Sequence, residues 1–468
     1  MSNGLYRAHR RALIGGAGLA AALCLAPPIF AQPAIDGPAV CAVTGDPAVP
    51  LLDAATRGRL EATLRDMVDR GIAPGVVMMI EQNGQPVFSF AHGMADAEHE
   101  RAMADDTLFR LYSMTKPITS LVALQLVAEG RLSLDDPVSR YIPEFADATV
   151  LADEGGPDAA PVSLERPVTI RDLLRHSAGL TYRTAEDNRA GPIYAARGIP
   201  AGPGLDQPPT DGSAPVQSLA ELVRRVADVP LLNQPGTDFT YGNATEVLGR
   251  VVEIVTGERL SQAFSARIFG PLGMSSTFFQ VPADDADRMS SAYVATAQFP
   301  DRTPGVMGSV PIEELGAAAL RLIDDAETSF FLPAPRIEYG GAGLVGTAGD
   351  YLRFTRAVRE NRRPDGAMLL PPALADAMRS NQLPPEALSD DPTLRGLGFG
   401  YGFAVKLGPT EAEPVFPQCG YFWGGAASTS FWIDPAGETS GVVMTQIFGG
   451  DVTSYQIELL RILYGETP

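Results

Sequence analysis

The spacing of apolar and polar residues changes several times along this chain, and each change predicts a new element. Apolar residues recur at helical intervals over residues 52–70, which predicts an amphipathic helix. Within residues 75–93, two β-type runs flank Asn83-Gly84, and this dipeptide between such runs is the strongest short signal of a β-hairpin. Residues 113–128 are apolar on nearly every side, which is typical of a helix buried in the centre of a fold.

The rest of the chain carries both kinds of pattern. Helical periodicity, in several places behind a capping residue, predicts helices at residues 169–179, 218–229, 243–257, 347–361 and 454–465. In the fourth of these, Thr347 and Asp350 fit a capping box. β-type runs predict strands at residues 398–408, 424–435 and 439–449.

These elements predict an α+β fold with one antiparallel sheet flanked by helices. A hairpin alone is not stable in water, so the early hairpin needs partners, and the three late strands supply them. The expected sheet lobe spans about residues 52–112 and 340–468, and residues 113–339 form a helical lobe. Inside that lobe, residues 189–216 are rich in Pro and Gly and form either an ordered lid that shapes a site or a loose insertion.

The N-terminus has the features of an export signal. Residues 1–31 combine a basic start, an apolar stretch rich in Ala and Gly, and a small residue at Ala31. The segment HRRALIG, residues 9–15, loosely fits a twin-arginine signal, and an ordinary secretory signal fits it equally well. We therefore expect residues 32–468 to form a single domain that is exported, periplasmic or secreted, without stable membrane association after cleavage.

Cysteine content and net charge limit the chemistry and the partners. Cys41 and Cys419 remain after signal removal, and in an exported protein they either pair or stay as two buried thiols. The formal net charge of −20 argues against binding to nucleic acid or to an anionic membrane surface. No His or Cys spacing suggests a metal site, and neither a metal nor another cofactor is expected.

Lysine is rare in this chain, and one lysine stands where its chemistry matters. Of the 36 Lys and Arg residues, only Lys116 and Lys406 are lysines. Ser113-Met-Thr-Lys116 places a serine and a lysine three residues apart on one face of the apolar helix. A serine hydroxyl needs a base to act as a nucleophile. Burial would lower the pKa of the Lys116 amine, which could then accept the serine proton.

A second segment supplies a possible partner for this lysine. Tyr241-Gly-Asn243 precedes a predicted helix. A phenol near a lysine can act as a base or a proton relay, and the Asn243 amide can bind both the substrate and Lys116. Taken alone, the segment would also fit a buried tyrosine and a helix-capping asparagine.

A third segment supplies backbone groups. Trp423-Gly424-Gly425 enters a predicted strand, where two glycines let a substrate approach the backbone. The next amide, of Ala426, could bind an oxyanion together with the amide of Ser113. Taken alone, the segment would also fit a strand bulge beside a core tryptophan.

Together and in this order, the three motifs resemble those of the serine β-lactamase and penicillin-binding-protein superfamily. The likeness is greatest to its class C-like branch and to the family VIII carboxylesterases, and it extends over about residues 55–465. LLRHSAGLTY and GGAGLVGTAGDYLRF are also similar to that group. The resemblance implies a DD-peptidase/β-lactamase-like catalytic domain, an acyl-enzyme on Ser113, and a base system of Lys116 and Tyr241.

The third motif departs from the pattern of β-lactamases and transpeptidases. Those enzymes carry Lys-Thr-Gly where this chain has Trp423-Gly424-Gly425, and their lysine and hydroxyl help to hold the substrate carboxylate. The Trp-Gly-Gly of family VIII esterases implies neutral acyl substrates instead. We therefore expect an exported serine hydrolase that cleaves small carboxylic esters. A β-lactamase, D-amino-acid peptidase or transacylase is one alternative, and a non-catalytic cell-wall binding protein of the same fold is another.

Other catalytic arrangements find little support. The chain has no G-x-S-x-G motif, so the nucleophile elbow of α/β-hydrolases is absent. His176 follows a predicted helix and is better explained as a structural partner than as a triad base. GAGLVG, residues 341–346, matches a dinucleotide-binding loop only formally, since no βαβ unit surrounds it, and we expect a tight turn beside the site.

Overall fold

The computed structural model describes most of the chain, and the described residues belong to one compact unit, 37–468. The described ranges are 52–152, 160–182, 189–204, 209–295, 320–334, 337–388, 396–408, 416–417, 419–449 and 452–465. The predicted export signal and Cys41 lie outside them. Cys419 is buried and disulfide-bonded, which favours the paired alternative over two buried thiols. Within these ranges no helix is long and apolar enough to cross a membrane.

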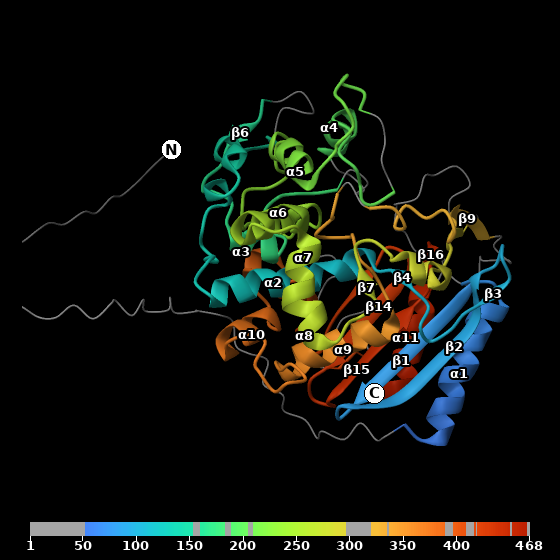
Figure 1. Cartoon of the computed structure of the whole chain (residues 1–468). Helices are drawn as coiled ribbons and strands as arrows, with labels where there is room; N and C mark the ends of the chain where they lie inside the picture. Colours follow the sequence, from blue (N-terminus) through green and yellow to red (C-terminus); the bar gives the residue numbers. More distant parts are fainter. Residues whose placement is uncertain are drawn as a thin grey trace, which may run out of the picture. The chain divides into compact units, whose positions relative to one another are not determined.

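An antiparallel sheet of eight strands among the described residues forms one side of the fold (Figure 1). Its early hairpin lies beside the late strands, as the sequence predicts, because β1 pairs with both β2 and β15. The strands, in order across the sheet, are β11 (Leu397–Phe399), β12 (Ala404–Lys406), β13 (Tyr421–Gly425), β14 (Thr429–Asp434), β15 (Thr439–Met444), β1 (Gly75–Gln82), β2 (Gln85–Asp96) and β3 (Arg101–Ala102).

The turn between β1 and β2 confirms the predicted hairpin. Asn83 and Gly84 have positive φ angles of 50° and 71°, as a two-residue turn of this type requires.

The prediction for the three late strands needs correction, because each predicted run contains more than one strand. In the run 424–435, small residues allow a turn at residues 426–428, where Ser428 has a φ of 60°. Trp423-Gly424-Gly425 therefore ends strand β13 and does not begin a strand.

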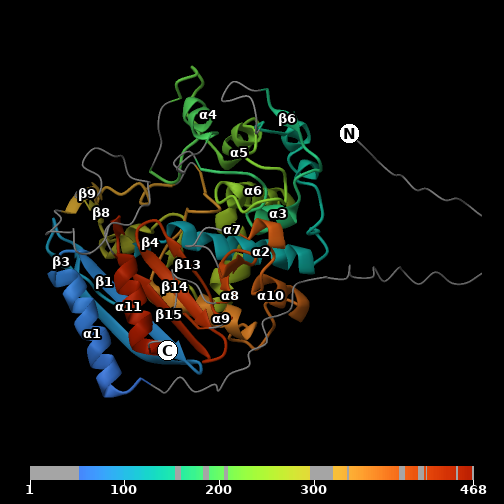
Figure 2. The same cartoon turned by 180° about the vertical axis from the view of Figure 1, so that it is seen from behind.

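Helices cover both faces of the sheet, as Figure 2 shows from behind. α1 (Ala54–Asp69) and α11 (Val452–Tyr464) pack on one face, and α9 (Ala348–Glu360) packs on the other. The strand period of two explains this arrangement, because neighbouring residues point to opposite faces. Val76 joins the apolar core under α1 and α11, while Val77 joins the core on the side of α9.

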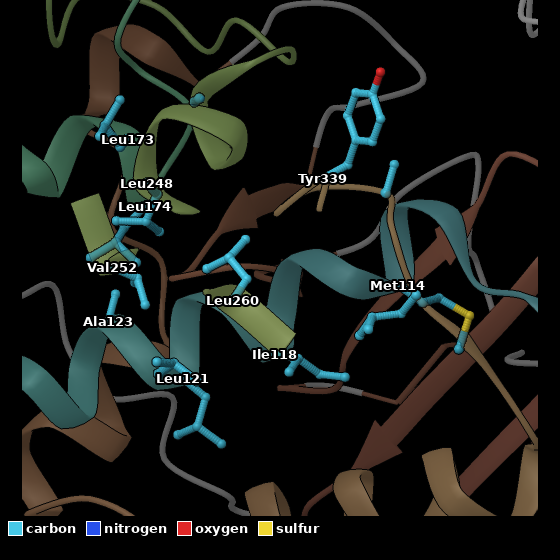
Figure 3. Close-up of a cluster of buried hydrophobic side chains, with 14 of the residues drawn as sticks. Met114, Ile118, Leu121, Ala123, Leu173, Leu174, Leu248, Val252, Leu260 and Tyr339 are labelled. Atoms are coloured by element: carbon cyan, nitrogen blue, oxygen red, sulfur yellow. The ribbon is translucent and has the colours of Figure 1, made fainter. Parts of the chain in front are cut away.

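The helix predicted at 113–128 lies in the middle of the apolar core on the side of α9. It begins at Thr115, because residues 112–114 form a turn of 3-10 helix, η1 (Tyr112–Met114). α2 (Thr115–Ala128) packs against α6 and α7, and Figure 3 shows part of this buried cluster. The remaining helices are α3 (Ile170–Leu174), α4 (Gly191–Ala196), α5 (Leu219–Ala227), α6 (Ala244–Thr256), α7 (Leu260–Phe264), α8 (Gly270–Leu272) and α10 (Pro372–Met378).

Smaller sheets accompany these helices, so the expected helical lobe also contains strands. They are β4 (Phe109–Arg110) with β10 (Val345–Gly346) and β7 (Thr277–Phe278), β16 (Ile447–Phe448) with β8 (Ala292–Ala295) and β9 (Leu320–Asp324), and β5 (Thr149–Val150) with β6 (Val162–Ser163). β4 ends three residues before Ser113. Arg110, the last residue of β4, is fully buried and forms a salt bridge of 2.5 Å with Asp324 on β9, which anchors the segment that precedes the serine.

The Pro- and Gly-rich insertion is ordered in its described parts. Residues 189–204 contain α4, and Tyr194 and Ile199 in this range are buried. Val216, at the far end of the insertion, is buried as well. These apolar anchors favour the first of the two expectations, an ordered segment, over a loose insertion.

The packing of β14 on β15 can be tested with Gly441→Ala. Gly441 lies opposite Trp432, and a Cβ at Gly441 would overlap the Trp432 ring. We expect the free energy of unfolding to fall by about 1–3 kcal/mol, because overpacking forces side chains out of their preferred rotamers. Urea denaturation measures this change.

Gly58→Ala is the matched control for that experiment. Gly58 lies on the exposed side of α1, and an added Cβ would meet nothing within 4 Å. Its replacement should stabilise the protein by about 0.5–1 kcal/mol, because Ala is a better helix former than Gly. Equal effects of the two substitutions would contradict the assigned packing.

Candidate active site

Ser113 lies at the junction of β4 and α2, in the single turn of η1. The residue before it, Tyr112, has a φ of 43°, an uncommon conformation for a non-glycine residue. Such backbone strain persists only where the surrounding structure imposes it. Here the end of β13 packs closely on the turn. The contact is so close that a Cβ at Gly425 would overlap the carbonyl oxygen of Leu111. The serine is thus presented by a turn that its neighbours hold in place.

Lys116 is fully buried one turn after Ser113, and its amine has three hydrogen-bond partners. Nζ lies 3.1 Å from Ser113 Oγ, 3.0 Å from the Tyr182 hydroxyl and 2.8 Å from the Gly341 carbonyl oxygen. The predicted contact between Ser113 and Lys116 is therefore present. The segment 341–346, predicted as a tight turn beside the site, forms a turn only at its start and ends as strand β10.

The expectation that burial lowers the pKa of Lys116 is wrong. Burial does act in that direction, but the charge interactions with Tyr182, Tyr241 and Glu246 and the hydrogen bond to Tyr182 raise the pKa above its ordinary value. Lys116 is therefore an ammonium at neutral pH, and its three N–H donors match its three partners.

Tyr241 lies beside this ammonium but does not receive a hydrogen bond from it. Lys116 Nζ is 4.9 Å from the centre of the Tyr241 ring. The Tyr241 hydroxyl instead accepts a hydrogen bond of 3.2 Å from Trp423 Nε1. The structure thus brings two predicted motifs into direct contact at Tyr241, and it places a positive charge next to a phenol.

Tyr182 is the site residue that sequence reasoning missed. It follows the short helix α3 in a segment without periodicity, and its hydroxyl receives a hydrogen bond from Lys116. Its only signal in the sequence is its place at the end of LLRHSAGLTY. Burial raises the pKa of the Tyr182 phenol even though the Lys116 charge opposes this change, so Tyr182 is neutral at rest.

Asn243 supports the site from behind. Its side-chain amide is buried and donates a hydrogen bond of 2.7 Å to the carbonyl oxygen of Thr181, the residue before Tyr182. It also hydrogen-bonds the Tyr194 hydroxyl. The expected contact between Asn243 and Lys116 is therefore absent from the hydrogen bonds of the described residues. Asn243 holds the segment that carries Tyr182.

The end of β13 lines a cavity of about 670 Å³ together with Ser113 and Tyr241. Trp423, Gly424, Gly425 and Ala426 all contribute to its wall. The Ala426 N–H has no backbone acceptor among the described residues, and Ser113 lies in a first helical turn, where N–H groups lack partners. Both residues that carry the predicted amides therefore line the same cavity.

The described walls of this cavity are mainly apolar and aromatic, and they carry no charged side chain. The uncharged polar members are Ser113, Ser428, Thr429, Ser430, Thr453 and Gln456. The aromatic and aliphatic members are Phe239, Tyr241, Phe416, Phe422, Trp423, Phe431, Trp432, Val443, Leu459 and Leu460. No described residue of the insertion 189–216 contributes, so the expectation that it shapes the pocket directly is not met. A separate cavity of about 550 Å³ near Arg259 and Glu338 contains none of the predicted site residues.

His176 packs against the Tyr241 ring, and the hydrogen bonds of the described residues include none between His176 and Ser113. Its ring is 4.7 Å from the Tyr241 ring and also packs against Phe239 and Phe399. Burial, with a smaller effect of the Lys116 charge, lowers the pKa of His176 well below its ordinary value, so the ring is neutral. Within the described ranges, no three His, Cys, Asp or Glu side chains gather as metal ligands would.

The chain is similar to several known proteins. A family model described as Beta-lactamase matches residues 60–463. Esterase EstB from Burkholderia gladioli is 36% identical over 401 residues, which cover 86% of this chain and 93% of that protein. Lovastatin esterase from Penicillium rubens is 31% identical over 409 residues, covering 82% and 91%. The structure of EstCE1, described as a hydrolase with promiscuous acyltransferase activity, matches with a TM-score of 0.69 at 29% identity, covering 88% and 99%.

Proposed function

The chain belongs to the beta-lactamase family and is a serine hydrolase that cleaves esters, and we propose that its substrates are neutral carboxylic esters attacked by Ser113. The cavity beside Ser113 carries this proposal, because its described walls hold no charged side chain. A carboxylate on the substrate would enter this space without a partner, and burial of an unpaired charge is costly. An apolar acyl or alcohol group would instead contact the aromatic wall.

Acylation by Ser113 follows from the contacts around it. The Oγ–carbonyl bond forms while the ester C–O bond breaks, and the serine proton moves through the base system to the leaving alcohol. We assign the amides of Ser113 and Ala426 as donors to the oxyanion of the tetrahedral intermediate, because both residues line the cavity. Water then attacks the acyl-enzyme and releases the carboxylic acid.

The resting charge of Lys116 changes how the base system works. An ammonium cannot accept the serine proton, so we assign proton acceptance to Tyr241, whose ring lies 4.9 Å from Nζ. The ammonium places a positive charge beside this proposed acceptor, and its hydrogen bond to Ser113 Oγ stabilises the developing alkoxide. Tyr182 orients Lys116 through its 3.0 Å hydrogen bond.

The proposed substrate class is tested by comparing p-nitrophenyl esters of short and long acyl chains with a chromogenic cephalosporin. We expect turnover of the esters and at most weak turnover of the cephalosporin, because the described lining of the cavity holds no cation for the lactam carboxylate. Ser113→Ala should abolish turnover in a protein that unfolds at the wild-type temperature. A folded Ser113→Ala variant with wild-type activity would contradict the assignment of the nucleophile.

The same assay separates the remaining activities. Faster turnover of the cephalosporin than of any ester would make the protein a β-lactamase. Binding of β-lactams without acylation or ester turnover would indicate a cell-wall binding protein. Acyl transfer is a second activity that we propose, because EstCE1 is described as having acyltransferase activity. It predicts a new ester when a small alcohol is added to the assay.

The two tyrosines have different expected effects. Tyr241→Phe removes the proposed proton acceptor and should lower kcat by about 100- to 10,000-fold. Tyr182→Phe removes one hydrogen bond to Lys116 and should lower kcat by only about tenfold. Steady-state kinetics with one ester measure both, and thermal unfolding shows whether each variant is folded. A larger loss in Tyr182→Phe than in Tyr241→Phe would reverse the assignment.

We also propose that residues 1–31 direct export, on the basis of their basic start, apolar stretch and small residue. The chain expressed in a Gram-negative host should appear in the periplasm with the mass of residues 32–468. Replacement of Arg10 and Arg11 by lysines should block export by the twin-arginine route and leave ordinary secretion unaffected. Full-length protein confined to the cytoplasm would contradict the proposal.

A further inference from the structure

Glu246 is a buried carboxyl beside the site that the mechanism above does not use. It lies in the first turn of α6, three residues after Asn243, and only 2% of its surface is exposed. Its Oε2 atom has no hydrogen-bond partner among the described residues. A buried carboxyl with an unpartnered oxygen is costly to keep, and such groups gather at functional sites.

The backbone of Gly340 and Gly341 separates Glu246 from Lys116. A Cβ added to Gly341 would lie 2.7 Å from Glu246 Oε1 and 3.2 Å from Lys116 Nζ, so both groups approach this glycine closely. The Gly341 carbonyl oxygen accepts a hydrogen bond from Lys116, while the amides of Gly340 and Gly341 donate to the carboxyl of Glu246. A single peptide segment therefore contacts the ammonium on one side and the carboxyl on the other.

The charges of these groups are linked. Burial raises the pKa of Glu246 to about 7, although the Lys116 charge and the glycine amides lower it. In turn, the Glu246 charge raises the pKa values of Lys116 and Tyr182. Among the described charged groups on the helices packed against α6, Lys116 is the one whose charge acts on Glu246. His176, after α3, is neutral and meets Thr245.

We propose that Glu246 is an electrostatic positioning residue of the active site, whose carboxylate acts across the Gly340–Gly341 segment to hold Lys116 as an ammonium aligned on Ser113. The inference rests on the proposed function, because it assumes that Ser113 is the nucleophile. Loss of the carboxylate leaves the contacts of Ser113 with Lys116 in place and removes the charge that balances the ammonium. The proton affinity of Lys116 and Tyr182 then falls.

The test follows the rate at which a fluorophosphonate modifies Ser113, measured by intact mass across the pH range. Glu246→Gln keeps the shape of the side chain and removes its charge. We expect the alkaline limb of its pH–rate profile, where Lys116 loses its proton, to move to lower pH by about one unit, because a neutral amide no longer favours the ammonium form of Lys116. Glu246→Asp retains a carboxylate that is withdrawn by one methylene, so its limb should lie between the two.

A structural role of Glu246 would lower the rate at all pH values without moving the limb. Glu253→Gln, two turns further along α6, is the matched control, since Glu253 pairs with Arg250 at 2.9 Å, and its limb should stay at the wild-type position. A folded Glu246→Gln variant with a limb at or above the wild-type pH overturns the inference. If that variant does not fold, an unchanged limb in Glu246→Asp overturns it equally.

The result also separates this inference from the proposed function. Wild-type protein that shows no adduct on Ser113 at any pH overturns both. Wild-type protein modified on Ser113, together with a Gln variant of unchanged profile, overturns the inference alone and leaves the assignment of the nucleophile intact.

Discussion

The arrangement of this site depends on one buried ammonium and on the groups that satisfy it. Lys116 is fully buried, and a buried charge is tolerated only when it is paired and hydrogen-bonded. Its three donors meet Ser113 on the preceding turn, Tyr182 after α3, and the carbonyl of Gly341 before β10. Three segments far apart in the sequence are thus brought together around one atom. The same contacts that make the ammonium tolerable also aim it at the serine.

Close backbone contacts allow this convergence. The end of β13 can approach the turn that carries Ser113 because Gly425 has no side chain, and this approach places the amide of Ala426 at the cavity. Gly341 plays the same part between α2 and α6, where a side chain would collide with Glu246 and crowd Lys116. A sequence pattern identifies such glycines as possible close approaches, but only the folded chain shows which groups come together there.

Local physics explains what the sequence predicted well. Asn83 and Gly84 favour positive φ angles whatever surrounds them, so the hairpin and its place in the sheet could be inferred. Ser113 and Lys116 are three residues apart at the start of a buried helix, which fixes their proximity. Long-range packing decided the rest. Tyr182 lies in a segment without periodicity, and the raised pKa of Lys116 depends on tyrosines and a glutamate that no local pattern connects to it.

The second lysine shows why the substrate class follows from the site and not from the fold. Lys406 lies on β12, the strand next to β13, so a cation is near the motif in which related β-lactamases carry their lysine. Its side chain is buried and donates a hydrogen bond to the carbonyl oxygen of Phe416. It is therefore engaged inside the protein and does not belong to the described lining of the cavity. Because this cation is not part of the described lining, the cavity beside the serine holds no charged side chain, and a neutral ester is the ligand that it can bury without leaving a charge unpaired.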